Sequence, residues 1–84
     1  MKLNELKNIM EKHKIWVYDY CLNEKDKPLA ETALCLMKTD RGFEYYVCER
    51  NIKRDMRLFQ SEDEACQAFL TDMAYDKPIL KRYL

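Results

Sequence analysis

The sequence is poor in residues on which many active sites depend. Its 84 residues include one glycine, two prolines and one histidine. One glycine cannot form the glycine-rich loops that hold phosphates or dinucleotides, since those motifs need several glycines within a few residues. The lone His13 lies between Lys12 and Lys14 at the end of a predicted helix, where a surface or capping role is favoured over catalysis. We therefore expect that the chain is not an enzyme.

An excess of one charge and long apolar runs are also missing. The 15 Lys and Arg residues balance 15 Asp and Glu residues, which argues against a general binder of nucleic acid or anionic membranes. The longest apolar runs, such as Ala33 to Met37, fall far short of the roughly 20 residues that cross a bilayer, and the N-terminus lacks a signal-peptide core. We expect a cytosolic protein with no membrane partner.

The cysteines show no metal-binding or redox spacing. None of the four lies in a Cys-x-x-Cys pair, and structural zinc sites normally need closely spaced ligand pairs. We predict free, mostly buried thiols at Cys21, Cys35, Cys48 and Cys66. We expect the chain to bind no metal and no cofactor.

Apolar and aromatic residues are plentiful, at 48% and 12% of the chain. This composition is sufficient for one core, and the length fits a single small domain over residues 1–84. The domain should be marginally stable, by about 5 kcal/mol.

Two helices are predicted. Leu3, Leu6, Ile9, Met10 and His13 recur at spacings of three and four, which indicates an amphipathic helix from Asn4 to His13 with Asn4 as its N-cap. The second helix follows Ser61, which forms a Ser-x-x-Glu capping box with Glu64, and it should end before Pro78. Its apolar stripe consists of Ala65, Cys66, Phe69, Leu70 and Met73.

Four strands are predicted between these helices. Their expected ranges are Ile15–Leu22, Glu31–Lys38, Phe43–Arg50 and a short edge strand Met56–Gln60. The connections are a loop at Asn23–Pro28, a tight turn at Thr39–Gly42 and a charged turn at Asn51–Asp55. The fold class is therefore α+β, a mostly antiparallel meander with the C-terminal helix packed on it.

Two features exceed what a minimal core needs. The first is the density of aromatic residues in the first and third strands, where alternation sends some side chains outward as interface anchors. Packing of the sheet alone is the competing explanation. The second is a basic group around the turn between the last two strands, Arg50, Lys53, Arg54 and Arg57, which is either a site for phosphates or carboxylates or a solvated turn.

The segment Tyr46-Val47-Cys48-Glu49-Arg50, followed by Phe59-Gln60-Ser61-Glu62-Asp63-Glu64-Ala65-Cys66-Gln67-Ala68-Phe69-Leu70, resembles a known family. It is similar to the small immunity proteins of bacterial polymorphic toxin and contact-dependent inhibition systems, most nearly the immunity protein 59 family. The shared pattern covers mainly residues 43–70 and has three parts. These are a Glu-Arg that ends a strand, a Phe-x-Ser-Glu that enters a helix, and an Ala-Cys-x-x-Phe-Leu along that helix.

The resemblance implies that the chain neutralises a cognate toxin domain by tight stoichiometric binding in the cytosol. The residues expected to bind the toxin are Trp16, Tyr18, Tyr20, Tyr46, Glu49, Arg50, Arg54 and Arg57. An acidic face that mimics nucleic acid is also open to it, built from Glu24, Asp26, Glu31, Glu62, Asp63, Asp72 and Asp76. The alternatives are an adaptor that binds another protein through the same aromatic residues, and a nucleic-acid-binding module that uses Arg50 to Arg57.

Overall fold

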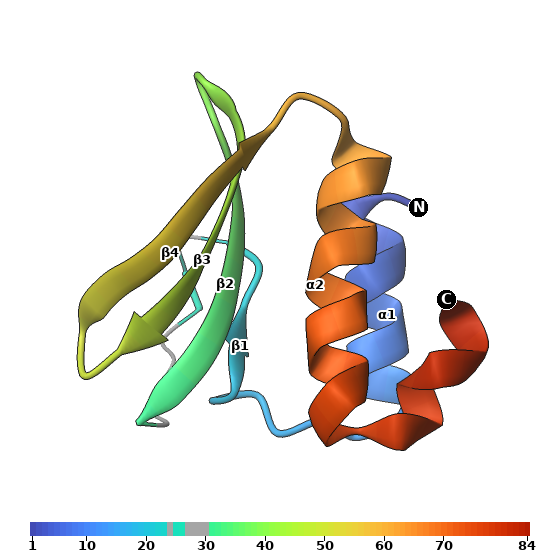
Figure 1. The fold of residues 1–84 in the computed structure, drawn as a ribbon. Coiled ribbons are helices and arrows are strands. Elements are labelled where there is room, and N and C mark those ends of the chain that lie inside the picture. The colour runs from blue at the N-terminus through green and yellow to red at the C-terminus, as the bar shows by residue number, and fades with distance from the viewer. Residues whose placement is uncertain (24, 27–30) are drawn as a thin grey trace.

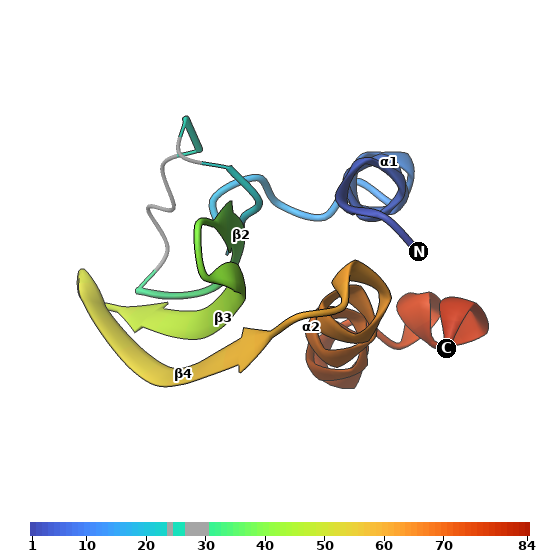
Figure 2. The same ribbon diagram turned by 90° about the horizontal axis from the view of Figure 1, so that it is seen from above.

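A curved four-stranded sheet carries both main helices on one of its faces (Figures 1 and 2). The computed structural model describes residues 1–23, 25–26 and 31–84. Their elements, in chain order, are α1 (Leu3–Lys12), β1 (Tyr20–Cys21), β2 (Thr32–Thr39), β3 (Gly42–Glu49), β4 (Ile52–Phe59), α2 (Glu62–Asp76) and the 3-10 helix η1 (Pro78–Tyr83). The predicted α+β class and the order of helix, four strands and helix are confirmed.

The hairpin of β2 and β3 follows the sequence closely. The strands pair antiparallel from Thr32↔Glu49 to Thr39↔Gly42. Gly42 has φ +134°, and a Cβ at this position would lie 2.6 Å from the carbonyl oxygen of Phe59. The chain's only glycine therefore stands where a side chain would be both strained and blocked.

The hairpin of β3 and β4 differs from the prediction. A charged turn at Asn51–Asp55 and a short strand at Met56–Gln60 were expected, but β4 already begins at Ile52. Arg50 and Asn51 have φ +51° and +66°, which are typical of a two-residue turn that suits the strand twist. Asp55, with φ +55°, lies where the register shifts between Tyr45 and Val47, so a β-bulge accommodates the charged segment within the strand.

The predicted strand Ile15–Leu22 is mostly wrong. Only Tyr20–Cys21 forms a strand, and it pairs parallel to β2 through Tyr20↔Leu34 and Cys21↔Cys35. The N–H of Asp19 donates to the carbonyl of Trp16 at 2.9 Å, which makes residues 16–19 a turn. Aromatic and β-branched side chains favour strands only where a neighbouring strand is available, and β2 is reached only at Tyr20. The predicted loop Asn23–Pro28 lies partly outside the described residues, since residues 24, 27 and 28 belong to the gaps.

The two main helices are joined at their N-terminal ends. Ser61 caps α2 as predicted, its Oγ accepting the N–H of Glu64 at 3.3 Å, and α2 ends before Pro78. Asn4 is not the N-cap of α1, because the helix already begins at Leu3. The carboxylate of Glu62 in α2 accepts the N–H of Leu3 at 2.8 Å, so a tertiary contact satisfies a donor at the start of α1.

Two buried clusters lie on opposite faces of the sheet. The main core lies between the sheet and the helices, and its fully buried members include Leu6, Met10, Leu36, Phe69, Leu70 and Leu80. A smaller cluster on the other face contains Cys21, Cys35 and Tyr46. All four cysteines are free; Cys48 is half-buried and the other three are buried, which largely confirms their prediction.

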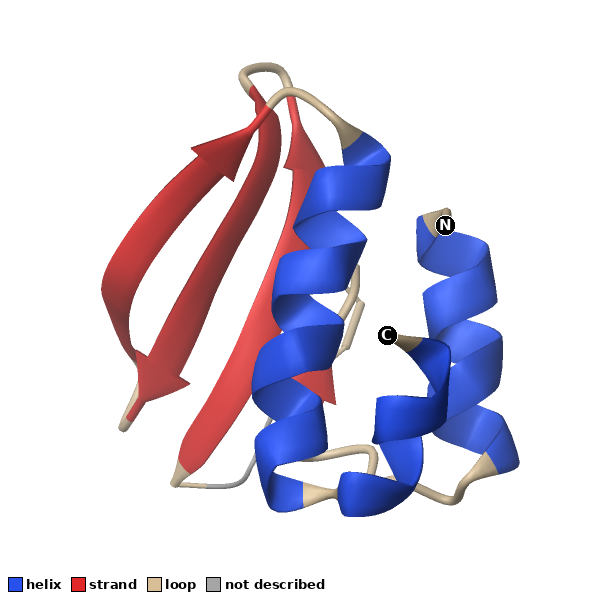
Figure 3. Cartoon of the chain, turned by 45° about the vertical axis from the view of Figure 1, so that its right-hand side comes forward, coloured by secondary structure: helices blue, strands red, loops and turns tan. Residues whose placement is uncertain are grey.

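The tail after α2 turns back against the helices (Figure 3). Leu80 of η1 enters the core, and the Nε2 of His13 lies 2.6 Å from the hydroxyl of Tyr83. His13 thus joins the end of α1 to the tail. Within residues 1–23, 25–26 and 31–84, no helix has the length and apolar character that crossing a bilayer requires.

Candidate protein-binding groove

The four aromatic residues expected to bind a partner separate into two pairs. Trp16 and Tyr18 lie in the turn before β1 with 56% and 36% of their surface exposed. Tyr20 faces the helices within the main core, and Tyr46 packs with the cysteines on the opposite face of the sheet. Tyr20 and Tyr46 are therefore unsuitable as exposed anchors, and their selection is corrected. The alternation of inward and outward side chains was predicted for a strand over Ile15–Leu22, but β1 has only two residues, so that pattern does not apply.

The exposed aromatic turn is held in place. The rings of Trp16 and Tyr18 meet edge to face, with centroids 5.2 Å apart and planes at 90°. Before them, the N–H of Ile15 donates to the carbonyl of Met10 at 3.0 Å; after them, the carbonyl of Asp19 accepts the N–H of Leu34 at 3.0 Å. Val17, between these two residues in the sequence, is 57% exposed. The turn thus presents three adjacent apolar side chains from a backbone anchored to α1 and β2.

Arg50 and Arg54 are neutralised within the chain. Arg50 donates to Glu31 through Nε at 3.0 Å and through Nη2 at 2.8 Å. Arg54 donates to Glu49 at 3.0 Å. Glu49 and Arg50 are the two residues of the family-like pattern without a role in packing, and each pairs with a neighbouring side chain. These contacts weaken the predicted anion site.

The other two basic residues lie over aromatic rings. The guanidinium of Arg57 is 5.1 Å from the ring centre of Tyr45 and 5.3 Å from that of Phe59, and one of its nitrogens is 3.8 Å from the carboxylate of Asp72. The ammonium of Lys53 lies 4.8 Å from the ring centre of Tyr46. Stacking of this kind is favourable for exposed cations. The predicted basic group therefore extends from the β3–β4 turn along β4, and each member has a partner.

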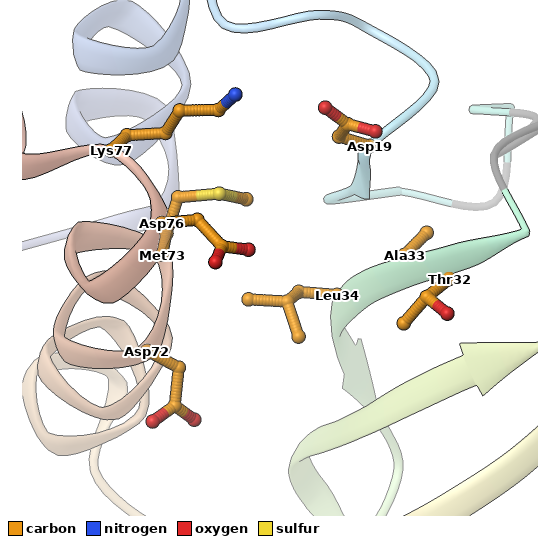
Figure 4. A pocket seen from close by; sticks show the side chains of 8 residues that line it. All are labelled: Asp19, Thr32, Ala33, Leu34, Asp72, Met73, Asp76 and Lys77. Atoms are coloured by element: carbon orange, nitrogen blue, oxygen red, sulfur yellow. The ribbon is translucent and has the colours of Figure 1, made fainter.

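Three adjoining pockets follow the C-terminal half of α2, and we call them together the α2 groove. The first, of about 440 Å³, is lined by residues 13–16 and by Asp76 to Ile79. The second, of about 410 Å³, lies between Asp19, the start of β2 and α2 (Figure 4). The third, of about 460 Å³, lies between α2 and the β3–β4 hairpin. Asp76 and Lys77 line the first two pockets, and Asp72 lines the last two.

Carboxylates dominate the middle of the groove. Asp72 and Asp76 stand one turn apart on α2, and Asp19 reaches in from the opposite side (Figure 4). The apolar side chains between them are Leu34 and Met73, while Lys77 supplies one cation. The groove therefore combines an apolar floor with an acidic wall on either side.

The carboxylates differ in how they are satisfied. Asp72 accepts a 2.6 Å hydrogen bond from the hydroxyl of Tyr45. Burial, and then this bond to Asp72, raise the pKa of the Tyr45 phenol, which keeps the hydroxyl a donor at neutral pH. The carboxylates of Asp19 and Asp76 make no hydrogen bond or ion pair with any described residue. Two negative charges thus remain available to a partner.

The predicted acidic face is not one surface. Glu62 and Asp63 bind the N-terminal segment, Glu31 pairs with Arg50, and Asp26 accepts the N–H of Leu22 at 2.8 Å. Glu24 lies outside the described residues. Only Asp72 and Asp76 line the groove. Sequence reasoning missed Asp19 because it was assigned to a strand; the spacing of Asp72 and Asp76, opposite the apolar stripe, was the one available signal.

The described residues contain no group of three His, Cys, Asp or Glu side chains arranged to hold a metal ion. No protein-family model, curated protein or solved structure matches this chain. The resemblance to immunity proteins therefore stays a prediction from residues 43–70, and the functional argument depends on the surface itself.

Proposed function

We propose that this chain is an immunity protein that binds and neutralises a cognate bacterial toxin domain in the cytosol, as a tight stoichiometric complex. The observation that carries the proposal is the anchored, exposed pair of Trp16 and Tyr18 at one end of a groove with two carboxylates that pair with none of the described residues. The resemblance over residues 43–70 supports the choice of a toxin as the partner.

An exposed aromatic pair is costly to a small domain unless it binds something. Large apolar side chains gathered on a surface favour association or aggregation, and Trp and Tyr are the residues most often responsible for binding energy at interfaces. Because the turn is held at both ends, Trp16 and Tyr18 lose little conformational freedom on binding. Inhibition by binding also uses no catalytic group of the inhibitor, so a complementary surface is sufficient.

An adaptor that binds a different protein would use the same surface, and only the partner's identity separates the two functions. Nucleic-acid binding is less well supported, because Arg50 and Arg54 are paired with carboxylates and the groove is acidic. A phosphate backbone would meet repulsion there.

The test is a growth-rescue assay combined with binding. Cells would express the C-terminal toxin domain encoded beside this gene, with or without the chain, and calorimetry would measure the affinity for a catalytically inactivated toxin domain. We expect a one-to-one complex and restored growth. Trp16→Ala should weaken both, while Tyr75→Ala, an 87% exposed aromatic outside the groove, should change neither. No complex and no rescue would exclude the immunity function.

A further inference from the structure

The geometry assigns a partner chemistry to the α2 groove: it receives a basic segment of the toxin, with one arginine side chain between Asp19 and Asp76 and Trp16 beside it. This inference rests on the proposed function and adds the interface and the kind of group that it recognises. Three independent features of the groove select an arginine.

The first feature is charge. Asp72 is satisfied by Tyr45 and lies near Arg57. Among the described residues, the middle pocket sets Asp19, Asp72 and Asp76 against one cation, Lys77, while the pocket at Trp16 adds Lys14 beside Asp76. The chain as a whole is neutral, so the middle pocket has a local excess of negative charge. Carboxylates bind guanidinium groups through short, charge-assisted hydrogen bonds, and an arginine has enough donors to reach two carboxylates at once.

The second feature is shape and polarity. Between the carboxylates lies an apolar floor of Leu34 and Met73. The three methylene groups of an arginine can cover such a floor while the charged end reaches the acids. Trp16 lines the adjoining pocket, which shares Asp76 and Lys77. A guanidinium bound to Asp76 therefore has, in the adjoining pocket, an aromatic ring of the kind that attracts cations most strongly.

The third feature is the position of Asp76 in α2. It is the last residue of the helix, and the last turn contains no basic residue. A negative charge at a helix C-terminus is unfavourable, because the exposed carbonyl groups already give that end partial negative charge. Asp76 thus has no role in stabilising its own helix. A cationic partner would reverse this repulsion.

Other occupants fit less well. The chain's own tail is already docked elsewhere, with Leu80 in the core and Tyr83 against His13. An acidic or phosphate-bearing ligand would be repelled by Asp19 and Asp76.

The test compares isosteric variants by calorimetry with the inactivated toxin domain. Asp19→Asn and Asp76→Asn should each weaken binding roughly tenfold at low salt, and the double variant more, because a buried ion pair loses its charge. Asp40→Asn, an exposed acid on the β2–β3 turn, is the matched control and should bind like the wild type. The losses should shrink as sodium chloride is added. Circular dichroism and melting curves would verify that each variant is folded.

A double-mutant cycle between this chain and the toxin domain identifies the toxin arginine that contacts Asp76. Each surface arginine of the toxin domain would be changed to alanine and measured against wild type and Asp76→Asn. One replacement should be non-additive with Asp76→Asn, which is the mark of direct contact. Wild-type affinity in the Asp19→Asn, Asp76→Asn double variant would overturn this inference and leave the proposed function intact.

A test without the toxin keeps the two proposals separate. A blocked tri-arginine peptide should shift the NMR signals of the Trp16 indole and of the Asp19 and Asp76 amides, and a blocked tri-glutamate peptide should not. Absence of these shifts would count against the groove as an arginine site even if the toxin binds. Concentration-dependent self-association lost in Asp76→Asn would assign the groove to a second copy and would likewise overturn the inference.

Discussion

The β3–β4 hairpin and the α2 groove are both rich in charge, but they use it in opposite ways. On the hairpin, Arg50 and Arg54 each hold a carboxylate within 3.0 Å. In the groove, Asp19 and Asp76 lie on opposite sides of the pocket, and neither has such a partner among the residues that the structure describes. The sequence makes the hairpin more conspicuous, because its basic residues lie close together along the chain. The charges available to a partner are those that the fold leaves unpaired, and a cluster of charges along the sequence does not identify them.

The energetics of the two regions differ accordingly. Ion pairs as exposed as those of the hairpin contribute at most about 1 kcal/mol each and fade with salt. In the groove, by contrast, the charge of Asp76 opposes the dipole of its own helix. We infer that the hairpin's charges serve the chain itself, whereas those of the groove serve a partner.

The largest effect is expected in the core that holds both regions in place. Phe69 is fully buried in α2. Phe69→Ala should lower the free energy of unfolding by about 3 to 5 kcal/mol through the cavity that it leaves. Urea unfolding measures the loss. Because this could abolish folding altogether, Phe69→Leu is the milder variant and should show a smaller loss of the same sign; unchanged stability in both would place Phe69 outside the core.

Substitutions in the groove and on the hairpin should differ in their effect on the affinity for the toxin. Trp16→Ala should cost about 2 kcal/mol of binding free energy, the size typical of an interface hot spot, with little change in stability. Arg54→Ala should cost less than about 0.5 kcal/mol, because its charge is already engaged by Glu49. Calorimetry with the inactivated toxin measures both. If Arg54→Ala weakened binding more than Trp16→Ala, the comparison would be reversed and the hairpin would be the interface.

The fold was largely predictable because its main signals are local. The Ser61 cap, the apolar stripe of α2 and the Thr39–Gly42 turn each depend on residues a few positions apart. The segment 15–19 was not predictable in this way, since its strand-like residues end in a turn once β2 is available only to Tyr20 and Cys21. Propensity describes what a segment favours alone, and the pairing partner decides the outcome.

The groove was less predictable than the fold. It joins Asp19, Leu34 and Asp76, which are far apart in the sequence and meet only when α2 packs on the sheet. The prediction of Trp16 and Tyr18 as anchors depends on residue type and on strand alternation; both are exposed, although they lie in a turn. Tyr20 and Tyr46 are aromatic residues of the same kind, but their side chains are buried. The direction of each side chain depends on how its strand pairs with β2, which the sequence pattern did not specify.

A smaller effect should follow from changing how Asp72 is satisfied. Tyr45→Phe removes the donor of the 2.6 Å bond and should lower the free energy of unfolding by about 1 kcal/mol at neutral pH. The folded-state pKa of Tyr45 is raised, so its contribution is fully present below the ordinary tyrosine pKa of about 10 and is lost as pH rises through the folded value. The wild type should therefore lose stability above pH 10 more steeply than Tyr45→Phe. Parallel curves for the two proteins would show that Tyr45 does not titrate differently on folding.

The smallest expected change in the free energy of unfolding is at Asp76, the last residue of α2. Asp76→Asn should raise the free energy of unfolding by about 0.3 to 1 kcal/mol, because it removes a negative charge from the helix C-terminus. The same change should weaken the toxin complex. Arg50→Glu on the hairpin should do neither of these: it loses the bond to Glu31, destabilises the chain slightly and leaves binding unchanged. Urea unfolding and calorimetry on the same preparations give both quantities. A residue whose removal stabilises the free protein and weakens its complex is retained for the partner; if Asp76→Asn lowered stability instead, Asp76 would belong with the self-paired charges of the hairpin.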